Sequence, residues 1–178
     1  MSNNALIVVD IQNDYFPGGK MELVGSEAAA RVAASVKANF KAQGLPVFMI
    51  QHIAQKPNAT FFLPNTSGAE IHESVKIEEG DELIIKHFPN SFRETPLLEK
   101  LQASKITELT IVGMMTHMCI DTTTRAASDL GFKVELIGNA CATRSLEHDG
   151  VTVSAKEVQA AYLAALDGSF ATVTNWKN

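Results

Sequence analysis

The chain has 178 residues, of which 46% are hydrophobic and 20% are charged, and its formal net charge is −5. Domains ordinarily hold roughly 100–200 residues, so we expect a single domain over residues 1–178 that folds without a disulfide or metal. The negative charge, without any Lys/Arg cluster longer than a pair, argues against nucleic acid or an anionic membrane surface as the main partner.

The N-terminus and the two cysteines indicate the compartment in which the protein works. The N-terminal segment lacks the basic region and cleavage site of a signal peptide. No apolar stretch approaches the roughly 20 residues that a transmembrane helix needs. Cys119 and Cys141 do not make the disulfide framework of a small secreted domain. We therefore expect a cytoplasmic protein without a membrane partner.

Short apolar runs alternate with longer helical patterns along the chain. The apolar runs have the length of strands, and they lie at 5–9, 46–50, 82–85, 108–112, 133–137 and 171–173. The predicted helices follow a Ser26 cap (27–43), begin at Thr95-Pro96, span 118–130, and run from a Ser154 capping box to about Asp167. The alternation predicts an α/β fold with helices on both faces of a mostly parallel sheet.

Three residues that can take part in catalysis follow predicted strands. Asp10 follows the first strand, Lys86 the third, and Cys119 lies beyond the fourth. Ligands of open α/β sheets sit beyond the carboxyl ends of the strands, so these side chains are expected at one edge. Together they supply a nucleophile, an acid/base and a cation, which is the set that a thiol hydrolase needs.

Cys119 is expected at or just inside a helix N-terminus. A helix N-terminus and a nearby ammonium both favour the thiolate, so a functional Cys119 is expected to have a lowered pKa. The free N–H groups of such a turn can also bind a developing oxyanion. The alternative is a small buried hydrophobe, which is what most free cysteines are.

Asp10 and Lys86 each have a structural alternative as well. As a catalytic group, Asp10 would take the thiol proton and later protonate a leaving group. The alternative is a turn-forming Asp that bonds local backbone amides. Lys86 would hold Asp10 ionised and stabilise a thiolate, or it would lay its stem on the sheet and place its ammonium in water.

Motifs of several rival enzyme classes do not occur in the chain. No G-x-G-x-x-G follows the first strand, and there is neither a Walker A loop nor a G-x-S-x-G elbow. The five histidines form no H-E-x-x-H, and no His/Cys spacing is typical of a zinc site. We therefore expect no cofactor and no metal.

Three groups of residues stand in an order shared with a known family. They are Ala5–Asp10 with Gln12, Asn13, Asp14 and Phe16, then Lys86 with Ser91-Phe92 and Thr95-Pro96-Leu97, then Val112-Gly113-Met114-Met115-Thr116 with Cys119, Thr122 and Ala126. This pattern resembles the isochorismatase-like cysteine hydrolases, and the resemblance runs over 5–173, nearly the whole chain.

The resemblance implies a three-layer α/β/α fold around a six-stranded parallel, Rossmann-like sheet with strand order 3-2-1-4-5-6. It implies a triad of Asp10, Lys86 and Cys119. It also implies a cis peptide between Met114 and Met115, with the N–H groups of Met115 and Cys119 aimed at an oxyanion. In that order Lys86 follows strand 3, two places from the switch point between strands 1 and 4, so it must reach inward.

Two departures from branches of that family narrow the expected chemistry. The nicotinamidase branch carries an Asp-x-His and a further His that bind a metal after the second strand, whereas this chain reads 50-IQHIA-54, without an Asp. We therefore expect neither the metal nor nicotinamide as substrate. The branch that cleaves the vinyl ether of isochorismate often lacks the cysteine, so Cys119 favours an amide or similar carbonyl substrate.

The irregular segment 53–79 is a long loop of the kind that is often functional in compact domains. The resemblance implies that it sets specificity, because it differs between branches of the family. Aromatic side chains and one histidine near the predicted site are either pocket walls or ordinary core residues: Phe16, Phe61, Phe62, Phe88, Phe92 and His52. We interpret Cys141, after the fifth strand, as a packing residue.

The expected function is hydrolysis of an amide-type C–N bond in a small molecule through a Cys119 acyl-enzyme. One alternative is vinyl-ether hydrolysis led by Asp10 without a covalent intermediate. Another is a catalytically silent binding module, in which Cys119 would show no perturbed reactivity. We also expect a homo-oligomer, at least a dimer, because the family is commonly oligomeric. Two alanine-rich helix faces suit either helix-on-sheet contact or an oligomer interface: Ala29, Ala30, Ala33, Ala34, and Ala160, Ala161, Ala164, Ala165.

Overall fold

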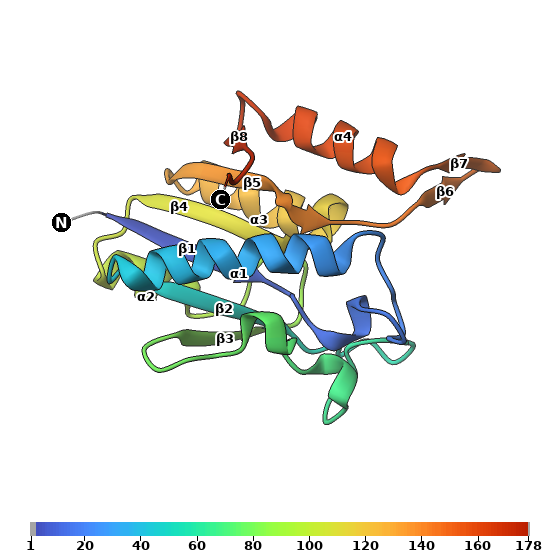
Figure 1. The fold of residues 1–178 in the computed structure, drawn as a ribbon, viewed down its shortest axis with the longest axis horizontal. Helices are drawn as coiled ribbons and strands as arrows, with labels where there is room; N and C mark the ends of the chain where they lie inside the picture. Colours follow the sequence, from blue (N-terminus) through green and yellow to red (C-terminus); the bar gives the residue numbers. More distant parts are fainter. Residues whose placement is uncertain (1–2, 178) are drawn as a thin grey trace.

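A computed structural model describes residues 3–177 and shows a six-stranded parallel sheet between two layers of helices (Figure 1). The strands pair in the order β3-β2-β1-β4-β5-β8. Their bounds are β1 Asn4–Val9, β2 Val47–His52, β3 Glu82–Lys86, β4 Glu108–Met114, β5 Lys133–Ala142 and β8 Thr172–Thr174. The predicted α/β fold and its strand order are therefore confirmed.

Alternate residues of the central strands enter two separate cores. Leu6 and Val8 of β1 face the core under α1 (Ser26–Ala42), where Ala29, Ala30 and Ala33 bring the helix close to the sheet. Ala5, Ile7 and Val9 face the opposite core, which contains residues of α2 (Leu97–Ala103), α3 (Asp121–Asp129) and α4 (Ala155–Leu166). Burial on both faces explains why this strand is a continuous apolar run.

The helix starts agree with the sequence signals to different degrees. Ser154 accepts a hydrogen bond from the Glu157 N–H, and Glu157 accepts one from the Ser154 N–H, which confirms the predicted capping box of α4. The predicted Ser26 cap is wrong, because Gly25 holds the cap position in a left-handed conformation that Gly adopts without strain. Ser26 is instead the first, buried residue of α1.

The predicted helix over 118–130 starts earlier and in another form. A π-helical turn, η4 (Thr116–Ile120), comes directly after β4 and leads into α3. The predictions also missed a hairpin formed by β6 (Leu146–His148) and β7 (Val151–Val153). Its signal was the dipeptide Asp149-Gly150, whose two positive φ angles suit a two-residue hairpin turn.

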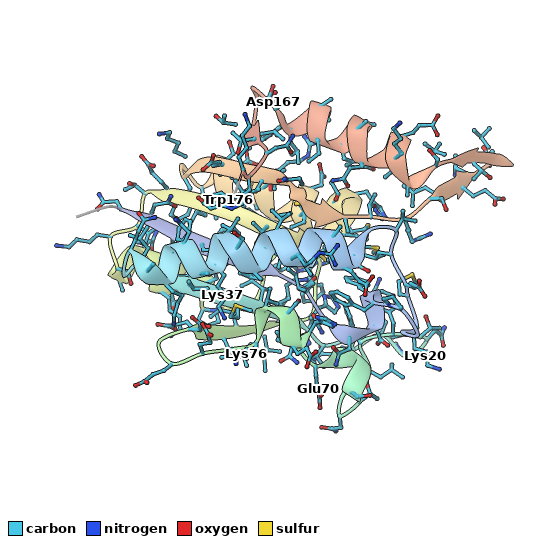
Figure 2. The ribbon with its side chains drawn as sticks, in the orientation of Figure 1. Lys20, Lys37, Glu70, Lys76, Asp167 and Trp176 are labelled. Atoms are coloured by element: carbon cyan, nitrogen blue, oxygen red, sulfur yellow. The ribbon has the colours of Figure 1, made fainter. Side chains whose placement is uncertain are left out.

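Polar contacts tie the irregular part of the chain to the sheet and helices. The segment 53–79 contains two short 3₁₀ turns, η2 (Ser67–Ala69) and η3 (Glu73–Val75). Lys37 on α1, labelled in Figure 2, donates hydrogen bonds to the carbonyl oxygens of Val75 and Lys76. It also lies 2.7 Å from a carboxylate oxygen of Asp81, just beyond the segment, and both side chains are buried. No helix within residues 3–177 is both long and apolar enough to cross a membrane.

Gly113 in β4 is required where β4 passes β1. Its φ is +131°, and a Cβ built there would lie 2.0 Å from the carbonyl oxygen of Val9. We expect Gly113→Ala to lower the free energy of unfolding by at least about 3 kcal/mol, because backbone strain adds to a clash with a fixed strand. Urea denaturation measures the loss.

Gly131 provides the matched control for this prediction. Its φ is also positive, at +91°, but no atom lies within 4 Å of its added Cβ. Gly131→Ala therefore carries the backbone strain without the clash, and we expect a clearly smaller loss. Equal losses for the two variants would contradict the proposed contact with Val9.

Candidate active site

Asp10, Lys86 and Cys119 meet at the carboxyl edge of the sheet. Asp10 directly follows β1, Lys86 ends β3, and Cys119 lies in the π-helical turn after β4. The Lys86 ammonium lies 2.7 Å from Asp10 Oδ2 and donates a hydrogen bond to Cys119 Sγ at 3.3 Å. Asp10 and Lys86 are fully buried, and Cys119 is 5% exposed. Lys86 thus reaches past the intervening strand β2 to both partners.

Two further acceptors surround the Lys86 ammonium. It lies 3.0 Å from His52 Nδ1 and donates to the Phe88 carbonyl oxygen at 3.1 Å. Ligand atoms of Asp10, His52 and Cys119 lie within 4.8 Å of one another, a spacing suited to a metal ion. The ammonium contacts all three groups, so the chain itself supplies a positive charge among them.

The Asp10 carboxylate has unused acceptor capacity. Lys86 pairs with it as a charge, but no described residue directs a well-oriented hydrogen bond at either of its oxygens. Its backbone has a positive φ of 51°, and its N–H donates to the Ile50 carbonyl oxygen, which fixes the residue at the strand end. A buried carboxylate with open lone pairs beside a thiol is suited to accept the thiol proton.

The charges around Cys119 set its protonation state. Burial raises the pKa of the thiol, and the Asp10 carboxylate raises it further, whereas Lys86 lowers it by less. The expectation of a lowered Cys119 pKa is therefore wrong, because it counted the ammonium and left out burial and the second charge. Burial lowers the pKa of Lys86, but Asp10 and Cys119 outweigh burial and raise it. The resting site holds a neutral thiol beside an ion pair.

This charge state predicts the titration of the thiol. In Cys141→Ala, which removes the other cysteine, we expect no thiolate absorbance at 240 nm to develop between pH 5 and 9. The double variant that also carries Cys119→Ala gives the background absorbance. A Cys119 transition centred between pH 5 and 8 would show that Lys86 outweighs burial and Asp10.

His52 contributes a neutral imidazole to the site. Burial and the neighbouring Lys86 charge lower its pKa to about 4. The ring is therefore uncharged at neutral pH, and its Nδ1 can accept from Lys86. Because the ring binds protons more weakly in the folded state, acidification from about pH 6.5 toward pH 4 favours unfolding through this group.

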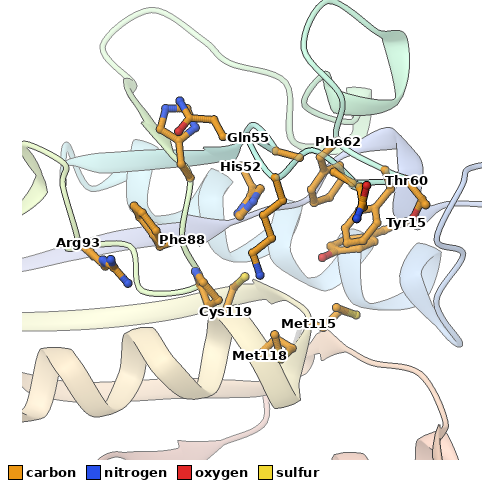
Figure 3. Close-up of a pocket in the computed structure, with 17 residues that line it drawn as sticks. Tyr15, His52, Gln55, Thr60, Phe62, Phe88, Arg93, Met115, Met118 and Cys119 are labelled. Atoms are coloured by element: carbon orange, nitrogen blue, oxygen red, sulfur yellow. The ribbon is translucent and has the colours of Figure 1, made fainter.

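A pocket of about 510 Å³ opens above Cys119 (Figure 3). His52, Phe61 and Phe62, all predicted as pocket residues, line it together with Phe88. The segment 54–62 supplies one wall, and Met115 and Met118 supply part of another. The irregular segment therefore forms much of the surface that a bound molecule would meet.

Two predicted pocket residues lie elsewhere. Phe16 stacks on His72 with ring centroids 3.6 Å apart, and it packs in the core under α1. Phe92 stacks on Phe132 at the edge of the opposite core. The residue that lines the pocket is Tyr15, one position before Phe16, because the 3₁₀ turn η1 (Asn13–Tyr15) places neighbouring side chains on different sides.

Lys56, Arg93 and Met118 also line the pocket and were not predicted. The Arg93 guanidinium lies 3.6 Å from the centroid of the Phe88 ring, which places a cation over an aromatic wall. Sequence spacing carries no signal for Lys56 and Arg93, since they come from irregular segments, and Met118 lies in the π-helical turn η4, whose form was not predicted. The pocket lining contains no Asp or Glu among the described residues.

Two buried polar side chains after β1 anchor the segment that walls the pocket. The Gln12 amide accepts from the His52 N–H and donates to the carbonyl oxygens of His52 and Ala69. Asp14 accepts a hydrogen bond from the Phe62 N–H at 2.7 Å. The peptide bond between Met114 and Met115, next to Cys119, is cis.

The chain matches the isochorismatase domain over residues 4–178. It belongs to the isochorismatase family. It is 50% identical over 169 residues to the uncharacterized isochorismatase family protein YddQ of Bacillus subtilis (strain 168), covering 95% of this chain and 94% of that one. The family assignment confirms the resemblance seen in the sequence, and it makes the protein a hydrolase.

A solved structure and a curated relative extend the comparison. A protein of Oleispira antarctica described as an isochorismatase hydrolase superposes with a TM-score of 0.93 at 48% identity, covering 97% of this chain and 92% of that one. Nicotinamidase 3 of Arabidopsis thaliana is 28% identical over 175 residues, covering 92% of this chain and 85% of that protein. Both likenesses extend over nearly the whole chain, so they include the carboxyl edge of the sheet.

Proposed function

We propose that this isochorismatase-family hydrolase cleaves an amide-type C–N bond in a small molecule through a covalent intermediate on Cys119. The observation that carries the proposal is the single ammonium of Lys86, which contacts both the Asp10 carboxylate and the Cys119 sulfur below a pocket. A base, a nucleophile and a compensating cation within contact distance meet the requirements of nucleophilic catalysis.

In the acylation step, Asp10 accepts the Cys119 proton while the sulfur attacks the substrate carbonyl carbon. The carbonyl oxygen becomes an oxyanion, which the N–H groups of Met115 and Cys119 stabilise. The C–N bond then breaks as Asp10 passes its proton to the leaving nitrogen. The product of this step is a free amine or ammonia and a Cys119 thioester.

In the second step, Asp10 accepts a proton from a water molecule that attacks the thioester carbonyl. The C–S bond breaks, the acid product leaves, and the proton on Asp10 returns to the sulfur. Lys86 keeps its positive charge in both steps, so the site can hold either a carboxylate or a thiolate. The neutral resting thiol fits this scheme, because the nucleophile forms only when substrate is attacked.

The charges of the pocket point to neutral or anionic substrates. Its described lining residues include Lys56 and Arg93 but no carboxylate, although the whole chain has a net charge of −5. A cationic substrate would meet like charges there. An amide substrate also accords with the nicotinamidase among the relatives, although the chain has Gln51 and His52 where an Asp-x-His metal motif would begin.

The proposal is tested with a library of small amides, by following the release of ammonia or amine. Cys119→Ala is expected to lose at least about 10³-fold in kcat/KM on any substrate found. Cys141→Ala removes the other buried cysteine, on β5, and is expected to retain wild-type turnover within about threefold. Full turnover by Cys119→Ala would refute the covalent mechanism.

The homo-oligomer and the cytoplasmic location stay predictions. Ala29, Ala30 and Ala33 are used inside the subunit, whereas Ala160, Ala161, Ala164 and Ala165 are exposed on α4. We propose that this α4 face takes part in the expected oligomer. Sedimentation as a pure monomer at micromolar concentration would contradict the oligomer.

A further inference from the structure

The Tyr15 hydroxyl is a polar group that the protein leaves without a partner. Tyr15 is 1% exposed and lines the pocket above Cys119. Its hydroxyl makes no hydrogen bond with any residue in the described part of the chain. The residue as a whole is buried, but its hydroxyl oxygen is not among the fully enclosed polar atoms, so it can bond to a molecule in the pocket.

The surroundings of Tyr15 hold its ring in one place. Its N–H donates to the Gln12 carbonyl oxygen at 3.0 Å, and its carbonyl oxygen accepts from the Leu23 N–H at 3.0 Å. The ring packs against Phe62, with centroids 4.6 Å apart, and against Phe61 at 5.9 Å. Packing thus fixes the Tyr15 ring, while its hydroxyl remains open toward the pocket.

The position of the hydroxyl is close to the reacting groups. In Figure 3 the oxygen of Tyr15 lies on the side of the ring that faces Met115 and Cys119. Burial is the main cause that raises the pKa of the Tyr15 phenol well above its usual value, and the nearby Cys119 and Asp10 raise it further. Tyr15 therefore remains a neutral hydrogen-bond donor throughout the working pH range.

We propose that the Tyr15 hydroxyl donates a hydrogen bond to an acceptor on the acyl part of the substrate. The site would then select small planar amides that carry a ring nitrogen or a second carbonyl close to the scissile carbon. The aromatic walls formed by Phe61, Phe62 and Phe88 suit a planar acyl group. This inference rests on the proposed amide hydrolysis and adds to it a specificity-determining residue.

The test uses benzaldehyde and the three pyridinecarbaldehydes, which differ only in the presence and position of a ring acceptor. Aldehydes form a reversible hemithioacetal with a cysteine, so their dissociation constants report binding without turnover. For at least one pyridine isomer, Tyr15→Phe is expected to weaken binding by about 5–30-fold, the effect of losing one hydrogen bond. Benzaldehyde is expected to change by less than about threefold.

Comparing each compound between wild type and variant removes differences in aldehyde reactivity, as in a double-mutant cycle. Tyr162, the other tyrosine of the chain, lies on α4 against His117 and does not line the pocket. Tyr162→Phe is therefore the matched control, and it should change none of the four constants. An equal effect of Tyr15→Phe on all four compounds would overturn the assignment.

A second measurement separates this inference from the proposed function. Benzamide and the three pyridinecarboxamides are titrated by calorimetry into Cys119→Ala with and without Tyr15→Phe, which needs no covalent step. If Tyr15→Phe weakens binding of one pyridinecarboxamide but not of benzamide, the hydrogen bond from Tyr15 is supported. If, in addition, no aldehyde forms an adduct on Cys119, the proposed nucleophile is contradicted. The role of Tyr15 would be overturned if aldehydes form adducts on Cys119 but Tyr15→Phe weakens none of the pyridine compounds selectively. It would also be overturned if no carboxamide binds.

Discussion

Lys86→Met is expected to lower the free energy of unfolding by about 3–5 kcal/mol and to abolish turnover. The substitution keeps the length and apolar stem of the side chain but leaves the fully buried Asp10 carboxylate without its counter-charge. Breaking a buried ion pair from one side is strongly destabilising for this reason. Urea denaturation at pH 7 measures the stability loss, and amide hydrolysis measures the activity.

Lys100→Met serves as the control for a lysine in a carboxylate pair. Lys100 pairs with Glu82 at the start of β3, but their side chains are 41% and 47% exposed. An exposed pair is worth about 0–1 kcal/mol, so this variant should keep both stability and activity. Similar losses of stability in Lys86→Met and Lys100→Met would contradict a special contribution of the buried Lys86–Asp10 pair.

Asp10→Asn is expected to lower kcat/KM by about 10³-fold or more, because it removes the carboxylate that contacts Lys86 and acts on the thiol. The same change should make Cys119 more acidic. Asp10 raises the pKa of the thiol and Lys86 lowers it, so removing the carboxylate leaves the ammonium as the dominant charge. Absorbance at 240 nm would show a thiolate at lower pH than in wild type.

This combination separates formation of a thiolate from catalysis. An enzyme limited by thiolate formation would gain activity in Asp10→Asn, whereas one that needs a proton acceptor and donor in each step would lose it. Asp81→Asn is the matched control, since the Asp81 side chain is also fully buried and lies 2.7 Å from the buried Lys37. It should lose stability but keep turnover, and loss of turnover in both variants would contradict a role specific to Asp10.

Local sequence signals were sufficient for most of the fold. The apolar runs predicted all six strands of the main sheet, and the Ser154 capping box predicted the start of α4, because these features depend on neighbouring residues. The hairpin β6–β7 was missed since its strands have three residues each, too short for a periodic pattern. Its Asp149-Gly150 turn was the available signal.

The candidate site depended on distances that sequence patterns do not contain. The contact of Lys86 with Asp10 and Cys119 requires an extended side chain to pass β2, and strand order alone does not decide that. Tyr15 rather than Phe16 lines the pocket because a short turn rotates the chain by one residue. The raised pKa of Cys119 follows from burial and two opposing charges, whose balance needs the three-dimensional arrangement.

The central claim is that Cys119 carries the acyl group of the substrate during turnover. Rapid acid quenching of wild-type enzyme with a turned-over amide, followed by peptide mass spectrometry, tests it directly. The predicted result is an increase by the mass of the acyl group on the peptide that contains Cys119, and none on the peptide that contains Cys141. Steady hydrolysis without any adduct on Cys119, retained in Cys119→Ala, would contradict it and favour direct attack on the substrate led by Asp10.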